Sequence, residues 1–365
     1  MNRFAGRLGI QQRVLPNYRV AFFDLLASAC DGGMSLFAGL PRSNEGVTNG
    51  ELQIANYRSG QNVHLLSGGL YLCYQRGLIN WLEEWQPGAL IVEANPRYLA
   101  TPLAVRWMHQ RGRPVLGWGL GAPSPLRPSP SGRGVGVRVW NAFINQFDAL
   151  ISYSQRGADE YASLGFPPER IYVAHNSVSS VPSSPIPLRD SKIDHPSILF
   201  VGRLQARKRV DFLLRACAQM ESVPRLVIVG DGPEREFLEA LAQQIYPSTK
   251  FIGAKHGAEL KTYFTEADLF VLPGTGGLAV QEAMSYGLPV IVARGDCTQD
   301  DLVRKENGWQ IPPDDFDALV STMKDALSDI ARLRRMGEES YRIVKEEINI
   351  EKMVESFVTA LNSMT

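Results

Sequence analysis

Short apolar runs alternate with stretches of helical periodicity along most of this chain. Runs such as Ala89–Glu93 and Leu269–Leu272 have the length of buried strands, and each has a helical pattern nearby. Over residues 233–244, for example, apolar side chains recur every three or four positions, which predicts an amphipathic helix. Strands that alternate with helices indicate an α/β architecture with parallel sheets.

Two stretches interrupt this alternation. Residues 122–137 are rich in Pro, Gly, Ser and Arg, which predicts a long loop that we expect to flank a ligand site. Residues 177–196 combine Ser, Pro and charge without periodicity, which is typical of a linker. Because 365 residues exceed one hydrophobic core, we predict domains over 1–180 and 181–345, with a helix over 346–365.

The overall charge is balanced, with 38 Lys and Arg against 38 Asp and Glu, so it does not indicate a nucleic-acid partner. The two halves differ, however. Residues 1–185 contain 16 Arg, no Lys and 11 acidic residues, whereas 186–365 contain the other 22 basic and 27 acidic residues. A basic first half favours contact with anionic lipid or a lipid phosphate. A compositional bias that replaces Lys by Arg explains the same pattern equally well.

Four widely spaced cysteines (Cys30, Cys73, Cys217 and Cys297) form no CxxC pair, which favours small core residues over a disulfide framework or a zinc site. Neither a signal-peptide pattern nor an apolar run of about 20 residues is found. We therefore expect a cytoplasmic protein, soluble or peripheral at the inner face of the membrane.

A glycine-rich turn follows the apolar run that ends at Leu272. Pro273 opens the sequence Pro-Gly-Thr-Gly-Gly, and a helix is predicted to begin near Gly277. Glycine allows close approach of the backbone, and the first N–H groups of a helix lack internal partners, so the segment can bind phosphate. Glu282, slightly more than one turn into that helix, could accept hydrogen bonds from a ribose diol. An ordinary structural turn is at least as common for this pattern alone.

A basic segment follows the strand predicted over 198–201. Four cations, at Arg203, Arg207, Lys208 and Arg209, come after the carboxyl end of that strand, where open parallel sheets bind ligands. Two such cations could bind a diphosphate and neutralise it as a leaving group. A solvated basic loop is the alternative interpretation.

Five motifs follow one another in the second half of the chain. They are Gly202-Arg203 with Lys208, Val-Gly-Asp-Gly-Pro at 229–233, Phe-Ile-Gly at 251–253, Ala267-Asp268 before Leu272-Pro273, and 282–290. In this order and approximate spacing they resemble the C-terminal domain of family 4 retaining glycosyltransferases, which have the GT-B fold. The resemblance extends from residue 198 to about 320, and in the first half it rests mainly on Ser-Tyr-Ser at 152–154 and on 171–176.

The resemblance implies two Rossmann-like domains facing across a cleft, with the terminal helix returning to the first domain. It implies that Arg203 and Lys208 hold the diphosphate of a nucleotide sugar and that Glu282 binds its ribose. A UDP-sugar of the UDP-glucose type is expected, with a saccharide or lipid-linked acceptor, no metal and no cofactor, in polysaccharide synthesis. The other donor-binding residues implied are Gly202, Phe251, Ile252, Thr275, Gly276, Gly277, Leu278 and Ala279.

Two departures from the family pattern concern the sugar. Many members place a second glutamate eight residues before the ribose-binding one, where this chain has Gly274. Many also place a histidine at a strand end that here contains Trp118, so Trp118 or a neighbour is expected to line the sugar pocket. Candidates for the acceptor site follow two strand ends in the first half, where ordinary loop polarity explains them equally well: Arg13, Tyr18, Glu93, Asn95 and Arg97.

Other functions are less consistent with the sequence. The Gly117-x-Gly119-x-Gly121 run is followed by Ala-Pro-Ser-Pro and not by a helix, which disfavours a dinucleotide-binding dehydrogenase. A P-loop motif is absent. A GT-B nucleotide-sugar epimerase or hydrolase stays open, and so does a catalytically silent binding subunit, which Gly274 suggests.

Overall fold

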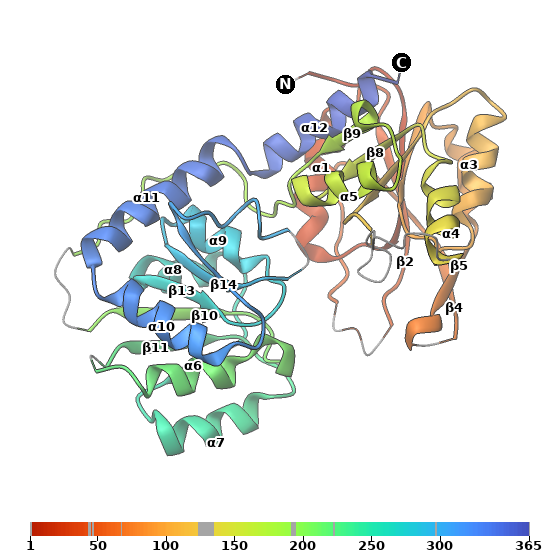
Figure 1. The fold of residues 1–365 in the computed structure, drawn as a ribbon. Coiled ribbons are helices and arrows are strands. Elements are labelled where there is room, and N and C mark those ends of the chain that lie inside the picture. The colour runs from red at the N-terminus through yellow and green to blue at the C-terminus, as the bar shows by residue number, and fades with distance from the viewer. Residues whose placement is uncertain are drawn as a thin grey trace. The chain divides into compact units, whose positions relative to one another are not determined.

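The computed structural model describes residues 2–42, 45, 47–66, 68–122, 135–190, 195–221, 223–295 and 298–364. The chain forms two compact units, Met1–Val178 with Ile350–Thr365, and Ser179–Asn349 (Figure 1). These boundaries lie two and four residues from the predicted ones at 180 and 345. Most of the predicted loop over 122–137, namely 123–134, lies outside the described residues.

Among its described residues, unit 1 is built on a seven-stranded parallel sheet in the order β3-β2-β1-β6-β7-β8-β9. The chain order reverses between β1 and β6. The strands are β1 (Leu8–Val14), β2 (Met34–Gly39), β3 (Asn56–Ser59), β6 (Ala89–Glu93), β7 (Val115–Gly119), β8 (Ala149–Ser152) and β9 (Ile171–Val173). A separate antiparallel hairpin consists of β4 (Gln61–Leu65) and β5 (Leu72–Arg76).

Helices bury both faces of this sheet. One hydrophobic core joins the sheet to α1 and α12, and another joins it to α2, α3, α4 and α5. The helix α12 buries an apolar stripe that includes Met353 and Phe357 and contacts α1, which confirms the expected return of the chain to its first unit. The helices are α1 (Val20–Ser28), α2 (Leu78–Trp85), α3 (Thr101–His109), α4 (Val135–Ile144), α5 (Gln155–Ser163) and α12 (Ile350–Asn362).

In the described part of unit 2, a six-stranded parallel sheet has the order β12-β11-β10-β13-β14-β15, which reverses between β10 and β13. Its strands are β10 (Ser197–Val201), β11 (Arg225–Val229), β12 (Lys250–Gly253), β13 (Leu269–Leu272), β14 (Val290–Ala293) and β15 (Gly308–Ile311). The helices are α6 (Val210–Cys217), α7 (Arg235–Ile245), α8 (Lys261–Glu266), α9 (Ala279–Ser285), α10 (Phe316–Leu327) and α11 (Ile330–Glu346).

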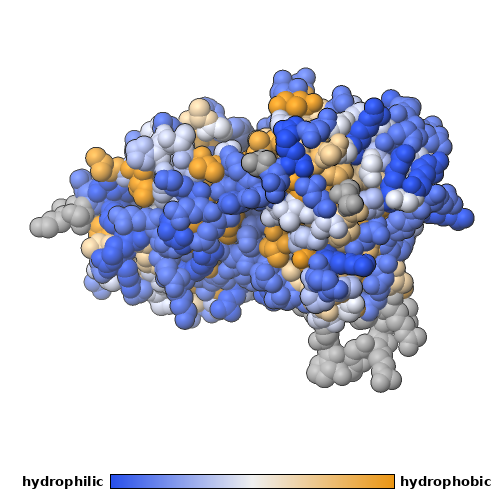
Figure 2. Space-filling view, turned by 90° about the horizontal axis from the view of Figure 1, so that it is seen from above, coloured by the Kyte–Doolittle hydropathy of each residue, from blue (hydrophilic) through white to orange (hydrophobic). Residues whose placement is uncertain are grey.

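The apolar runs identified in the sequence are buried strands. Every residue of β10, β13 and β14 is buried, as expected for parallel strands covered on both faces. The face of the molecule shown in Figure 2 is mostly polar, with apolar side chains in separate patches. The α/β architecture expected from the alternation is therefore confirmed in both units.

Candidate functional site

The sheet of unit 2 creates a natural binding position where its strand order reverses. From β10 the chain proceeds outward through β11 and β12, and then returns to place β13 on the other side of β10. The connections that follow β10 and β13 therefore diverge, which leaves a crevice at the carboxyl ends of these strands. Both loops singled out in the sequence, 202–209 and 273–278, begin at this point.

Hydrogen bonds join these two loops directly. The Lys208 side chain is buried, and its Nζ donates to the carbonyl oxygens of Thr275, at 2.9 Å, and Gly276. Arg207 Nη1 also donates to the Thr275 oxygen, at 3.0 Å, while the Thr275 N–H donates to the Arg207 oxygen at 3.1 Å. Two positive charges are thus held beside the glycine-rich turn by backbone oxygens.

The four cations of the basic segment have different environments. Arg209 is ion-paired with Asp211, at 3.2 Å, and with Asp314, and it stacks on a phenylalanine ring, so its charge is already compensated. Arg203 is exposed, and its side chain makes no hydrogen bond or ion pair with the described residues. Of the two cations predicted to bind diphosphate, Lys208 is therefore prepositioned and Arg203 is available to an anion.

Gly274 is required by the packing of the two loops. A Cβ atom at this position would lie 2.1 Å from the Arg207 oxygen and 2.4 Å from Lys208 Cα. Both are backbone atoms, which cannot move aside as the end of a flexible side chain could. Gly274, at the position of the family's second glutamate, thus packs directly against the backbone of the basic segment.

The Gly-Asp-Gly turn after β11 supports the loop that carries Arg203. A Cβ atom at Gly230 would lie 1.9 Å from the Gly202 oxygen, and one at Gly232 would lie 2.2 Å from the Leu204 oxygen. The Leu204 N–H donates to the Asp231 oxygen at 2.9 Å. The sequence indicated only a turn here, because a close approach between Gly230 and Gly202, 28 positions apart, is not visible in the motif.

The turn before α9 presents unpaired backbone donors. Gly276 has a φ of +66°, a conformation that favours glycine. The N–H groups of Gly276, Gly277 and Leu278 donate to no acceptor in the described part of the chain. Ala279 begins α9, two residues later than the predicted start near Gly277. These free N–H groups and the Lys208 ammonium together can hold an anion.

Glu282 lies on the first turn of α9, and its carboxylate has no hydrogen-bond or ion-pair partner among the described residues. The side chain is half-buried, and this burial raises the pKa of its carboxyl group. A half-buried carboxylate without a donor is costly, which is consistent with a ligand that supplies hydroxyl groups.

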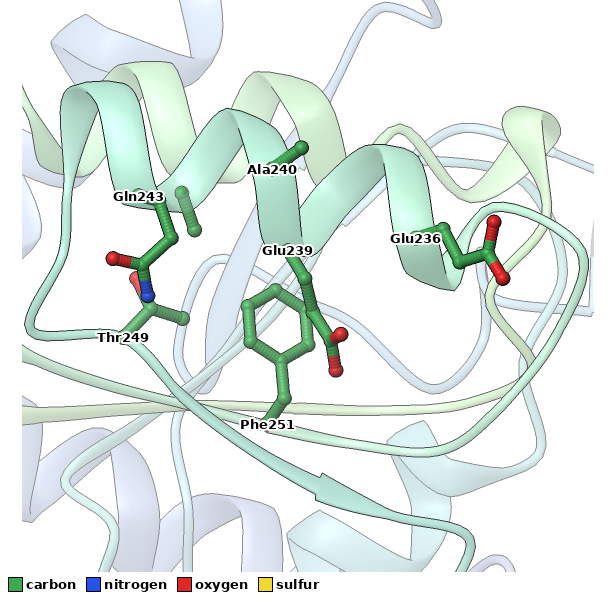
Figure 3. A pocket seen from close by; sticks show the side chains of 7 residues that line it. Glu236, Glu239, Ala240, Gln243, Thr249 and Phe251 are labelled. Carbon is green, nitrogen blue, oxygen red and sulfur yellow. The ribbon is translucent and has the colours of Figure 1, made fainter.

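Phe251 and Ile252 do not line one pocket. Successive residues of a strand point to opposite faces of a sheet. The Phe251 ring lies in a hollow under α7, beside Glu239 (Figure 3), whereas Ile252 lines a cavity on the other side of the strand, with Tyr263. The resemblance implied that both residues bind the donor, but side chains on opposite faces of one strand cannot both line one pocket.

The acceptor candidates of unit 1 lie near its own strand reversal, between β1 and β6. Arg13 Nη1 contacts both carboxylate oxygens of Glu45, at 2.9 and 3.1 Å, so the charge of Arg13 is compensated. Burial opposes the charge on Glu45, but hydrogen bonds from Arg13 and Arg42 outweigh it and lower the pKa of that carboxyl group. Tyr18 is 49% exposed and Arg97 is exposed.

Asn95 and Glu93 lie at the carboxyl end of β6. The Asn95 side-chain oxygen accepts a hydrogen bond from the Arg97 N–H at 3.1 Å, which shapes the loop after β6. Burial raises the pKa of the Glu93 carboxyl group, although the neighbouring Tyr98 and Arg13 partly oppose this. These side chains lie near the strand reversal of unit 1, but their contacts do not indicate which ligand they would bind.

Trp118 does not line a sugar pocket, contrary to expectation. Its side chain is only 2% exposed and packs against Phe22, Tyr153 and Phe357, with ring centroids 4.9 to 5.6 Å apart. The strand β7 turns this residue toward α1 and α12, into the core of unit 1. Alternation along β7 decides this, and the sequence did not show which face was buried.

No group of three or more His, Cys, Asp or Glu side chains in the described ranges is arranged to hold a metal ion. The chemistry that the site of unit 2 can perform is anion binding by cations and backbone N–H groups, with one carboxylate beside them.

Residues 189–343 match the family model of "Glycosyl transferases group 1". Unit 2 is a glycosyltransferase domain of group 1. Over 151 residues the chain is 34% identical to the GDP-mannose-dependent alpha-mannosyltransferase of Corynebacterium glutamicum, a match that covers 40% of this chain and 35% of that protein. With LpsE of Rhizobium meliloti, a lipopolysaccharide core biosynthesis glycosyltransferase, it shares 23% identity over 78% of this chain and 87% of that protein.

The chain spans less than half the length of several curated relatives that it matches, since the matches cover 29% to 45% of those proteins. In structure, it is similar over its full length to Anabaena HepE in complex with UDP, with a TM-score of 0.68, 16% sequence identity and complete coverage of both chains. This likeness confirms the GT-B fold that the motif order implied.

Proposed function

We propose that this chain is a retaining, metal-independent hexosyltransferase. Its donor is a UDP-sugar, UDP-glucose in type, and its acceptor is a saccharide or a lipid-linked saccharide in the synthesis of a polysaccharide. It needs no cofactor and acts in the cytoplasm or at the inner face of the membrane. The observation that carries this proposal is the grouping of Lys208, the Gly276 turn and Glu282 at the strand reversal of the glycosyltransferase domain.

The grouping suits a nucleoside diphosphate. Arg203 and Lys208 supply two cations to the diphosphate, and charge-assisted hydrogen bonds contribute about 1.5–3 kcal/mol each. The free N–H groups of Gly276, Gly277 and Leu278 add neutral donors to the same oxygens. The Glu282 carboxylate then accepts hydrogen bonds from the ribose hydroxyls, because no described residue donates to it. The carboxylate and the diphosphate are both negative, and the positive charges of Arg203 and Lys208 offset the repulsion between them.

In the proposed reaction, the acceptor oxygen attacks the anomeric carbon on the side from which the diphosphate leaves. The bond between that carbon and the phosphate oxygen breaks, and the new glycosidic bond forms with the same configuration. The acceptor hydroxyl proton passes to the departing phosphate. Arg203 and Lys208 stabilise the charge that accumulates on the diphosphate in the transition state, which is the main protein contribution.

Titration calorimetry with UDP and GDP in EDTA tests the donor site. The double variant Arg203→Ala, Lys208→Ala is expected to weaken nucleotide binding at least about 100-fold, since two charge-assisted contacts are lost. Arg215→Ala, an exposed cation on α6, is the matched control and should bind as the wild type does. Unchanged affinity in the double variant would refute the site.

The same titration selects the base. The Corynebacterium relative is GDP-mannose-dependent and HepE was solved with UDP, so the curated and structural comparisons support different bases. We favour UDP, and preferential GDP binding would replace it. Transfer from UDP-glucose to a panel of saccharides, with NMR of the product's anomeric proton, tests retention.

A catalytically silent binding subunit is the second candidate, because Gly274 leaves the sugar without a second glutamate. Nucleotide-sugar binding without either transfer or hydrolysis would favour it. Release of free sugar or of an epimer without acceptor would instead favour a hydrolase or an epimerase.

A further inference from the structure

Unit 1 carries a β-hairpin that is separate from its main sheet. We call it the leucine hairpin and define it as β4, β5 and the described residues between them, which are Leu66 and 68–71. Its strands pair in antiparallel register from Gln61 opposite Arg76 to Leu65 opposite Leu72. In Figure 1 the hairpin extends away from the parallel strands of unit 1.

The inner face of the leucine hairpin is polar and hydrogen-bonded. The Asn62 side chain donates to the Arg13 oxygen at 2.7 Å, and the buried Gln75 side chain donates to the Gln12 oxygen at 3.0 Å. His64 Nδ1 lies 2.8 Å from the Tyr71 hydroxyl. Polar side chains therefore attach the hairpin to unit 1, where antiparallel strands normally place apolar ones.

The outer face is apolar. Because side chains alternate along a strand, Val63 faces out beside Tyr74, and Leu65 faces out beside Leu72. Exposure increases toward the tip, from 37% at Tyr74 and 41% at Leu65 to 65% at Leu66 and 74% at Leu70. This pattern is the reverse of that of a water-facing hairpin. Leucines placed together at a tip indicate an apolar partner.

The surroundings of this tip are basic. No Asp or Glu occurs between Glu51 and Glu83, a stretch that includes the whole leucine hairpin. The Arg42 guanidinium lies 4.8 Å from the centre of the Tyr71 ring, next to Leu70. Arg42 and Arg13 both pair with the single carboxylate of Glu45, at 3.0 and 2.9 Å, so this group of three side chains keeps a net positive charge. Burial, together with the charges of Arg42 and Arg13, lowers the pKa of His64, although Glu45 partly opposes it.

We propose that the leucine hairpin docks this chain on an anionic lipid bilayer. Leu65, Leu66 and Leu70 enter the boundary between head groups and acyl chains, and Arg42 and Arg76 lie at the level of the phosphates. A stable protein interface buries about 800 Å² per partner, with about 20–30 residues on each side, whereas the exposed large apolar side chains described at this tip are Leu65, Leu66, Leu70 and Tyr74. A fluid apolar phase needs no matching surface, and tyrosine with arginine at its border is typical of membrane interfaces.

In the described residues, no helix is long and apolar enough to cross a bilayer. Attachment through a few leucines and a local positive charge gives reversible binding that depends on anionic lipid. The proposal stands on the hairpin alone and does not depend on the donor site.

Co-sedimentation of the full chain with vesicles tests this proposal. One set of vesicles is phosphatidylcholine, and the other contains phosphatidylcholine and phosphatidylglycerol in equal parts. The wild type is expected to bind the anionic vesicles preferentially, and the triple variant Leu65→Ser, Leu66→Ser, Leu70→Ser should bind at least about tenfold more weakly. The matched control changes three exposed leucines elsewhere, Leu103, Leu120 and Leu188, to Ser and should bind as the wild type does.

Three outcomes would overturn the proposal. They are a wild type that binds neither vesicle, a hairpin variant that binds as well as the wild type, and a control variant that loses binding equally. Sedimentation velocity without lipid adds a fourth: a dimer that only the hairpin variant loses would assign the surface to a second copy of this chain. Unchanged thermal unfolding and nucleotide affinity in the hairpin variant would show that it is folded and that its donor site is unaffected.

Discussion

Gly274 leaves no space for a side chain, and this can be tested without knowing the donor sugar. In Gly274→Ala the new methyl group would lie 2.1 Å from the Arg207 oxygen, whereas real Cβ contacts are essentially never under 3.0 Å. The two loops must therefore separate by about 0.9 Å or more, an overpacking change that typically costs about 1–3 kcal/mol. That shift also displaces the Thr275 and Gly276 oxygens that hold Lys208.

Two measurements follow from this geometry. Urea unfolding of Gly274→Ala should show a lower free energy of unfolding by about 1–3 kcal/mol at an unchanged m-value. Calorimetry should show weaker binding of the preferred nucleotide, because the Lys208 ammonium no longer lies beside the glycine-rich turn. Gly274→Glu should behave in the same way and should not recover the family's sugar contact.

Gly295→Ala is the matched control. It lies near the same turn, and an added methyl group would meet its nearest neighbour, the Gly276 nitrogen, at 3.6 Å, an ordinary contact. We expect its stability and nucleotide affinity to match the wild type. The reasoning would be refuted if Gly274→Ala were as stable as this control and bound nucleotide as well.

Three further predictions concern other parts of the chain. Because burial raises the pKa of Glu282, its ionisation destabilises the fold as pH rises, so Glu282→Gln should be more stable than the wild type at neutral pH. That difference in stability should vanish near pH 4, close to the pKa of an ordinary glutamate. Glu282→Gln should also bind nucleotide more weakly. Identical curves of stability against pH for the two proteins would contradict this reasoning. The buried Gln281 side chain accepts a hydrogen bond from the Ser179 N–H and donates one to the Ile348 oxygen. Gln281→Met should therefore lower the free energy of unfolding in urea by about 1–3 kcal/mol, whereas Gln243→Met, at an exposed position, should leave it almost unchanged. Because Trp118 is buried in the core of unit 1, Trp118→Ala should lower the free energy of unfolding by about 3–5 kcal/mol, and an unchanged value would contradict this.

The loops 202–209 and 273–278 show what local sequence patterns can predict and what they cannot. A strand followed by Gly-Arg and a strand followed by a glycine-rich turn predicted two ligand-binding loops, because strand ends and glycine turns have a local signature. Their mutual contact was not predicted. Lys208 meets Thr275 only because β10 and β13 are neighbours in the sheet, across almost 70 residues of chain.

The acceptor candidates show the opposite limit. Arg13 and Trp118 were singled out from their positions after or within strands, but one pairs with Glu45 and the other is buried in the core. Which face of a strand is covered, and which acid lies beside which arginine, depends on how the helices pack. Position in the sequence does not decide this.

By itself, the sequence determined the α/β class, the two-part organisation, the two loops that we propose bind the donor and, through its motif order, the glycosyltransferase family. These features follow from hydrophobic periodicity and local turn chemistry, which act over a few residues. The tertiary structure decided that Gly274 is a packing requirement, that the Glu282 carboxylate meets no partner among the described residues, and that the leucine hairpin faces outward with its apolar side. Each of these depends on which distant segments come within a few ångströms, and long-range packing alone sets those distances.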